Sequence, residues 1–246
     1  MCIRDRARYA ESRWLTEALP DAAQAALGVG AVDPRNRFMS GLPALLLKRA
    51  LSLSARCFTL DAACASSLYA IKAACDALHD GQADVMLAGA VNCSDDLFIH
   101  VGFCALKAMS KTGQSRPFHA EADGLVPAEG AAFVVLKRLE DAERDGDTIH
   151  GVIRGVGLAN DGRARGLLAP AEEGQIRAMQ QAYEVSGVDP AAITLLECHA
   201  TGTPVGDATE VRSSAAVFGE QTDLPLGSLK SNTGHLITAA GAAGLI

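Results

Sequence analysis

The chain has 246 residues, of which 49% are hydrophobic and 21% are charged, and its formal net charge is -7. This composition is typical of a folded globular unit with a sizeable core. The acidic balance and the scattered basic residues argue against a nucleic acid partner, because binding phosphates requires clustered lysine and arginine. The longest apolar run, residues 236–246, is too short to span a bilayer and predicts a buried helix.

Seven cysteines are present, an odd number, and no two of them form a Cys-x-x-Cys pair. The chain begins without a signal-peptide pattern. We therefore expect no disulfides and a reducing cytoplasmic location.

The N-terminal segment, residues 1–35, is poorly matched to any pattern, and residues 1–6 suggest an artefact of an incomplete reading frame. The first readable element is the apolar run Cys57-Phe58-Thr59-Leu60, which predicts a short buried strand. Apolar residues recur at helical spacing after Cys64, until Gly81 stops the helix. Cys64 is therefore expected at a sharp turn from strand to helix, where helix N–H groups and the helix dipole favour a thiolate nucleophile.

The following segments alternate between strand and helix patterns. A continuous apolar run at 83–91 predicts a strand that completes a βαβ unit with the Cys64 helix. Strands are also predicted at 133–136 and 149–156, and we expect them to pair across a polar link at 140–147. A helix is predicted at 172–186. Another helix is predicted to start near Asp207, because Asp207 and Glu210 have capping-box spacing.

Two later segments place polar residues directly after apolar, strand-like runs. His199 follows residues 193–196, and Lys230 and His235 follow residues 224–229. Open α/β sheets build their sites at strand ends, so Cys64 and both histidines are expected to contribute to one site.

Taken together, these motifs resemble the β-ketoacyl synthase family, the decarboxylating condensing enzymes of fatty-acid and polyketide assembly. The resemblance rests on the cysteine motif, on the two motifs that contain His199 and His235, and on intervening signatures, and it covers 36–246. The signatures are Ser115-Arg116-Pro117-Phe118, Ala122-Asp123-Gly124, Glu129-Gly130-Ala131 and Asn160-Asp161-Gly162. Two positions depart from the family pattern: Ala200 stands where glycine is usual, and His119 stands where an acidic residue is common.

The resemblance implies a role for each site residue. Cys64 would carry the acyl group as a thioester, with its backbone N–H as an oxyanion donor, while His199 and His235 would donate hydrogen bonds to the malonyl thioester carbonyl. Lys230 would be the buried lysine that organises the site, and Thr201 and Thr203 would bind the phosphopantetheine arm. Cysteine with two histidines resembles the elongating synthases rather than the Cys-His-Asn enzymes.

The implied fold is a thiolase-like α/β arrangement with α/β/α/β/α layers, which we expect to be truncated at both ends. Residues 36–246 would form a partial ketosynthase domain of a polyketide or polyunsaturated fatty acid synthase. No bound cofactor or metal is expected, since substrates would arrive on the phosphopantetheine of an acyl carrier protein or on coenzyme A. The implied partners are the acyl carrier, acyltransferase and other synthase domains, and a second copy when the domain is complete. We expect the chain alone to be inactive.

Two other hypotheses stay open. One is a thiolase-like acyltransferase, or a non-elongating malonyl decarboxylase, on the same fold. The other, more remote, is a binding module in which Cys64, His199 and His235 hold zinc, although these residues lack the usual closely spaced ligand pair.

Overall fold

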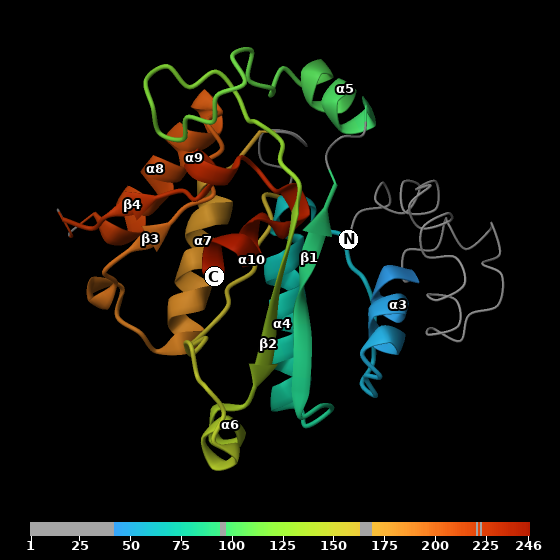
Figure 1. The fold of residues 1–246 in the computed structure, drawn as a ribbon. Coiled ribbons are helices and arrows are strands. Elements are labelled where there is room, and N and C mark those ends of the chain that lie inside the picture. Colours follow the sequence, from blue (N-terminus) through green and yellow to red (C-terminus); the bar gives the residue numbers. More distant parts are fainter. Residues whose placement is uncertain (1–41, 94–96, 163–168, 220, 222) are drawn as a thin grey trace. The chain divides into compact units, whose positions relative to one another are not determined.

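The computed structural model describes residues 42–93, 97–162, 169–219, 221 and 223–246, and these residues form two compact units (Figure 1). The first unit takes its described residues from 1–96, 129–138 and 237–242, and the second consists of those in 97–128, 139–236 and 243–246. The poorly matched N-terminal segment, residues 1–35, lies outside the described residues.

Helix α4 (Ser66–His79) and strands β1 (Val85–Asn92) and β2 (Gly130–Lys137) form the centre of the first unit. The strands pair antiparallel, from Val85 opposite Lys137 to Asn92 opposite Gly130. Figure 1 shows the two strands side by side with α4 along them. The remaining elements of this unit are α3 (Leu42–Ala50), the 3-10 turns η3 (Ala63–Ala65) and η5 (Ile237–Ala239), and the first residues of α10 (Ala240–Leu245).

The core of the first unit is made of small and aliphatic side chains. Ile71 and Ala74 of α4 are each 2% exposed, and Ala239 and Ala242 are fully buried. Ala242 donates its N–H to the Ser67 hydroxyl at 2.9 Å. Gly241 allows this approach, since a Cβ there would lie 2.5 Å from Leu68 Cγ. The helix predicted at 236–246 is confirmed only over 240–245, where its small residues explain why it can pack so closely.

The second unit contains two helices of similar length, α7 (Glu172–Ser186) and α8 (Pro204–Phe218), and the short parallel strands β3 (Leu196–Glu197) and β4 (Leu226–Gly227). Tyr183 of α7 and Phe218 of α8 meet edge to face, with ring centroids 5.7 Å apart. The other elements of the second unit are α5 (Leu97–Ala105), α6 (Leu139–Asp145), η4 (Pro190–Ala192) and α9 (Lys230–Thr233).

Several element predictions are confirmed by these bounds. The helix predicted at 172–186 has the bounds of α7, and the predicted Cys64 helix and the 83–91 strand correspond to α4 and β1. The apolar runs before His199 and Lys230 do form strands, but each has only two residues.

Two strand predictions are wrong. Residues 57–60 form no strand, and Phe58 is 58% exposed, because a short apolar run does not by itself specify a pairing partner. Residues 149–156 also form no strand: β2 pairs with β1 instead, and helix α6 occupies most of the predicted polar link. The first strand of the predicted βαβ unit is therefore missing among the described residues.

Helix α8 starts three residues before its predicted start. Proline favours the first position of a helix, and Pro204 begins α8 with Thr203 as the N-cap residue. The predicted capping box is therefore wrong, since no side chain caps this helix, and Asp207 and Glu210 make other contacts.

None of the helices within the described ranges has the combined length and apolar character needed to cross a membrane. No disulfide joins any two of the six cysteines in the described part of the chain.

Candidate active site

Cys64 occupies the turn that leads into α4. It lies in η3, a single 3-10 turn followed directly by α4, and its side chain is half-buried. Ala63 has a φ of 50°, a left-handed conformation that is rare for a residue with a Cβ. Such backbone strain is concentrated at functional turns, where the surrounding structure holds it in place. The predicted position of Cys64 directly before a helix is confirmed, but residues 51–62, which precede the turn, contain no strand.

Local hydrogen bonds hold this turn. The Asp61 carboxylate accepts the Ala63 N–H at 2.9 Å. The Ser66 hydroxyl accepts the Ala62 N–H at 2.9 Å and donates to the Ala63 carbonyl at 2.7 Å. The turn that presents Cys64 is thus stabilised by residues within three positions of it.

The two predicted histidines lie together in the second unit. His199 follows β3 and His235 follows α9, and their ring centroids are 5.3 Å apart at an interplanar angle of 83°. His235 is 1% exposed, whereas His199 is exposed. His235 is held by its main chain, which donates to the Val126 carbonyl at 2.7 Å and accepts from the Ala128 N–H at 2.9 Å.

Lys230 lies beside this pair. It is 6% exposed, and its ammonium donates to the Cys198 carbonyl at 3.3 Å. The prediction that Lys230 is a buried lysine rather than a surface cation is confirmed. A buried cation next to two imidazoles disfavours their protonation.

Burial and charge both act on the two imidazoles. Burial is the main cause that lowers the pKa of His235, to about 3, and His199 and Lys230 lower it further. The surrounding protein, and then Lys230, lower the pKa of His199 to about 4. Because part of His199 reaches water, we expect solvent to weaken this effect there more than at His235. Both rings are therefore neutral near pH 7, and each keeps one N–H to donate.

Cys198, next to His199, is unsuited to nucleophilic chemistry. It is 5% exposed, and burial, followed by Glu210 and Glu197, raises the pKa of its thiol to about 12. Burial, followed by Asp76, also raises the pKa of Cys75 in α4, although Lys72 opposes this. These two thiols stay protonated near neutral pH, which disfavours them as nucleophiles.

Thr201 and Thr203 form the turn between His199 and α8. Their hydroxyl oxygens are 3.1 Å apart, and Thr201 is 6% exposed. Ala200, where the resemblance led us to expect glycine, is 1% exposed, so its methyl group is accommodated by the packing.

The sequence assigned Asp207 and Glu210 to a helix cap, but both brace the histidine segment. The Asp207 carboxylate is 6% exposed and accepts the N–H groups of Thr201 at 3.0 Å, Gly202 at 3.2 Å and Phe118 at 2.8 Å. Glu210 accepts the His199 N–H at 2.6 Å. Burial is the largest influence on Glu210 and raises its pKa. The signal that could have revealed these roles is a pair of carboxylates one helical turn apart, directly after the turn that carries His199, Thr201 and Thr203.

The second unit therefore brings together His199, His235, Lys230 and the two threonines, while Cys64 belongs to the first unit. Two neutral imidazole donors beside a buried cation can stabilise an oxyanion or an enolate that develops between them. A strained turn that presents a thiol at a helix start suits covalent catalysis. These features define a candidate enzyme for acyl-transfer chemistry.

Comparisons with known proteins identify the family. The sequence model for the beta-ketoacyl synthase N-terminal domain matches residues 16–142, and that for the C-terminal domain matches residues 150–246. The chain belongs to the β-ketoacyl synthase family.

Similar proteins come from large synthases. A mycocerosic acid synthase-like polyketide synthase of Mycolicibacterium smegmatis is 44% identical over 197 residues, which cover 80% of this chain and 9% of that protein. One polyunsaturated fatty acid synthase subunit from Thraustochytrium sp. is 42% identical over 193 residues, which cover 76% of this chain and 7% of that protein. The chain thus spans less than a tenth of these two curated relatives.

Solved structures agree with this assignment. The ketosynthase from module 6 of the bacillaene synthase of Bacillus subtilis 168 aligns with a TM-score of 0.81 at 37% identity, covering 85% of this chain and 38% of that chain. The PfaC keto synthase–chain length factor aligns with a TM-score of 0.83 at 40% identity, covering 98% of this chain and 27% of that chain. The predicted thiolase-like α/β fold is confirmed, and the chain covers part of the domain in these neighbours.

Proposed function

We propose that this chain carries the catalytic residues of an elongating β-ketoacyl synthase, which condenses an acyl group bound to Cys64 with a malonyl group in a decarboxylative Claisen reaction. The observation that carries the proposal is the edge-to-face His199–His235 pair beside the buried Lys230. Support for joining Cys64 to this pair comes from the order of the three motifs in a family member. A cysteine with two histidines favours elongation over the Cys-His-Asn chemistry of related enzymes.

The first half-reaction uses the Cys64 thiolate. It attacks the carbonyl of an acyl thioester, the carrier leaves as its thiolate with the electron pair of the broken C–S bond, and the acyl group stays on Cys64. The backbone N–H of Cys64, in the turn before α4, would stabilise the oxyanion, and one such donor contributes about 3–4 kcal/mol to a transition state.

The second half-reaction uses the two histidines. Their N–H groups donate to the malonyl thioester carbonyl, so the enolate formed on loss of carbon dioxide is stabilised as its charge develops. The enolate carbon then attacks the Cys64 thioester carbonyl, and the cysteine thiolate leaves with the electron pair of the broken C–S bond.

We further propose the partners of this site. The hydroxyls of Thr201 and Thr203 are suited to hydrogen-bond a phosphopantetheine arm, which would come from an acyl carrier protein or coenzyme A. Other synthase domains would supply and remove the substrates, and a second copy of the domain would form a dimer.

The test is to map acylation in a full-length ketosynthase that carries this sequence. After incubation with an acyl carrier, peptide mass spectrometry should find the acyl group on Cys64, and Cys64→Ala should lose both acyl-enzyme and condensation while its circular dichroism stays unchanged. Acyl groups found instead on Cys57, Cys75 or Cys198 would contradict the assignment.

The same protein separates the alternative functions. Decarboxylation without a condensed product would indicate a non-elongating decarboxylase, and condensation with acetyl-CoA in place of malonyl carriers would indicate a thiolase-like transferase. Stoichiometric zinc that is lost in Cys64→Ala would favour the binding module.

A further inference from the structure

One segment of the second unit, residues 110–128, contacts both histidine motifs, and we call it the brace. Its Phe118 N–H bonds to Asp207 at 2.8 Å, and its Gly124 N–H bonds to the Gly202 carbonyl at 2.9 Å. Its Val126 carbonyl accepts the His235 N–H. These three contacts use backbone groups of the brace, so they depend on its path rather than on its side chains.

Ser115 contacts the second histidine motif through its side chain. Its hydroxyl donates to the backbone carbonyl of Lys230 at 2.5 Å, across 115 positions of sequence. The same carbonyl accepts the Gly234 N–H at 3.0 Å, the bond that closes α9 just before His235. Ser115 therefore acts on the first residue of the short helix that leads to the buried histidine.

Lys230 is thus held at both of its ends. Ser115 fixes its main chain, and the Cys198 carbonyl accepts a hydrogen bond from its ammonium at 3.3 Å. Helix α9 has only four residues and no side-chain cap, so it has little stability of its own. The placement of the lysine charge depends on these outside contacts.

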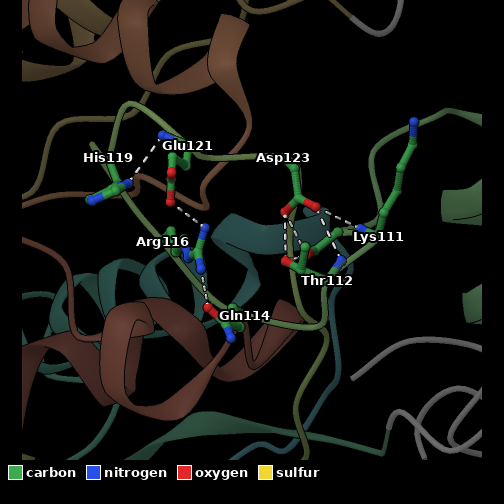
Figure 2. Close-up of polar contacts among 8 residues, drawn as sticks. Lys111, Thr112, Gln114, Arg116, His119, Glu121 and Asp123 are labelled. Atoms are coloured by element: carbon green, nitrogen blue, oxygen red, sulfur yellow. Dashed lines mark hydrogen bonds and ion pairs between the residues drawn. The ribbon is translucent and has the colours of Figure 1, made fainter.

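The turn that carries Ser115 is itself anchored. In Figure 2, Asp123 faces Lys111 and Thr112, whose N–H groups it accepts at 3.0 and 3.1 Å. The Ser110 hydroxyl donates to the same carboxylate at 2.6 Å, and these bonds, led by that of Ser110, lower the pKa of Asp123.

The other side of Ser115 is anchored as well. Figure 2 also shows Arg116 reaching Glu121 at 2.9 Å and contacting Gln114. His119 accepts the Glu121 N–H at 3.1 Å, which gives this departure from the family pattern a local structural role. Ser115 consequently lies between two hydrogen-bonded points of one turn.

We propose that Ser115 is a positioning residue for the enolate-forming step: its hydroxyl holds the Lys230 main chain, and thereby the lysine charge and His235, in the geometry that the reaction needs. The inference rests on the proposed function. A hydroxyl that only stabilised the fold would change melting temperature and leave the turnover of folded enzyme unaltered.

The experiment measures decarboxylation of malonyl-loaded acyl carrier protein by a full-length ketosynthase that carries this sequence and Cys64→Gln, where the amide imitates the acyl thioester. Adding Ser115→Ala should lower kcat about fivefold to tenfold, as expected for one lost hydrogen bond, with KM unchanged. Ser115→Thr, which keeps the hydroxyl, should restore most of kcat. The matched control is Ser186→Ala, which also removes a hydroxyl bonded to a backbone carbonyl, that of Tyr183, but in helix α7. It should leave kcat unaltered.

A second pair of variants covers a folding defect in Ser115→Ala. Threonine and valine have nearly the same shape, so Ser115→Thr and Ser115→Val differ mainly in the hydroxyl. Equal kcat values for these two would overturn the proposal, as would a raised KM with kcat unchanged. If the Cys64→Gln parent itself releases no carbon dioxide, the proposed function fails; if the parent is active and Ser115→Ala equals it, only the role of Ser115 fails.

Discussion

The turn around Cys64 and the cluster around His199 and His235 are built in different ways. Cys64 is held by Asp61 and Ser66, both within three positions of it in the sequence. The histidines depend on contacts from distant segments, such as Phe118 to Asp207 and Val126 to His235. A local turn can be formed by a few neighbouring residues, whereas the histidine cluster requires the tertiary structure of the second unit. The two regions should therefore respond differently to substitution.

The largest expected effect separates the two regions by half-reaction. In the proposed mechanism the histidines stabilise the malonyl enolate without the thiolate, so Cys64→Gln should still release carbon dioxide from a malonyl carrier. In that background His235→Ala should decrease the rate by about 10²–10⁴, the usual contribution of a positioned proton donor. Carbon dioxide release is measured directly, with His150→Ala as the control at an exposed histidine. Equal rates with and without His235 would remove this residue from the mechanism.

The next effect concerns pH and stability. His235 has its pKa lowered from 6.5 to about 3, so the unfolded chain binds a proton that the folded chain excludes once pH falls below 6.5. The stabilisation is fully present above pH 6.5 and decreases as the pH falls toward the folded pKa. At two pH units below 6.5 the loss reaches about 2.7 kcal/mol. Urea unfolding at about pH 7 and about pH 4.5 measures this loss, and His235→Asn should reduce it. An unchanged pH dependence in that variant would mean that another group is responsible.

A smaller effect is expected at Asp207, which joins the threonine turn to the brace. Asp207→Asn keeps the shape but replaces one carboxylate oxygen with an amide donor, which leaves at least one buried backbone N–H without its acceptor and costs about 1–3 kcal/mol. Denaturant unfolding should report this loss, and KM for the acyl carrier should rise as Thr201 shifts. Asp189→Asn, at an exposed 3-10 cap, is the matched control. A normal KM despite the lost stability would limit Asp207 to a structural role.

The smallest effect is expected at the Cys64 turn. Ser66 is 1% exposed and bonds two backbone groups, so Ser66→Ala should lower stability by about 1–2 kcal/mol and slow acylation of Cys64. Histidine-dependent decarboxylation should not change, because the histidine cluster has its own supports. Single-turnover acylation and melting temperature are the measurements, with the exposed Ser54→Ala as control. Equal losses in both half-reactions would show that the two regions are not independent.

The accuracy of the sequence predictions follows the same division. The Cys64 turn and the helices at 66–79 and 172–186 were predictable because periodicity and turn residues are local signals. The strands at 57–60 and 149–156 were wrong because strand pairing depends on a distant partner that a single segment does not specify. Asp207 and Glu210 were assigned to a helix cap because their spacing fits one, but their acceptor oxygens bind N–H groups upstream of the helix.

The sequence by itself determined the family, and it singled out the candidate site residues Cys64, His199, His235 and Lys230 because they stand in motifs of fixed order. Only the tertiary structure decided how the histidine pair is supported. It buried Lys230 beside two neutral imidazoles, raised the pKa of Cys198 out of the nucleophilic range, and brought Ser115 to the Lys230 carbonyl. The physical reason is that burial and long-range hydrogen bonds arise only when segments far apart in the chain pack together, and those interactions set protonation states and distances.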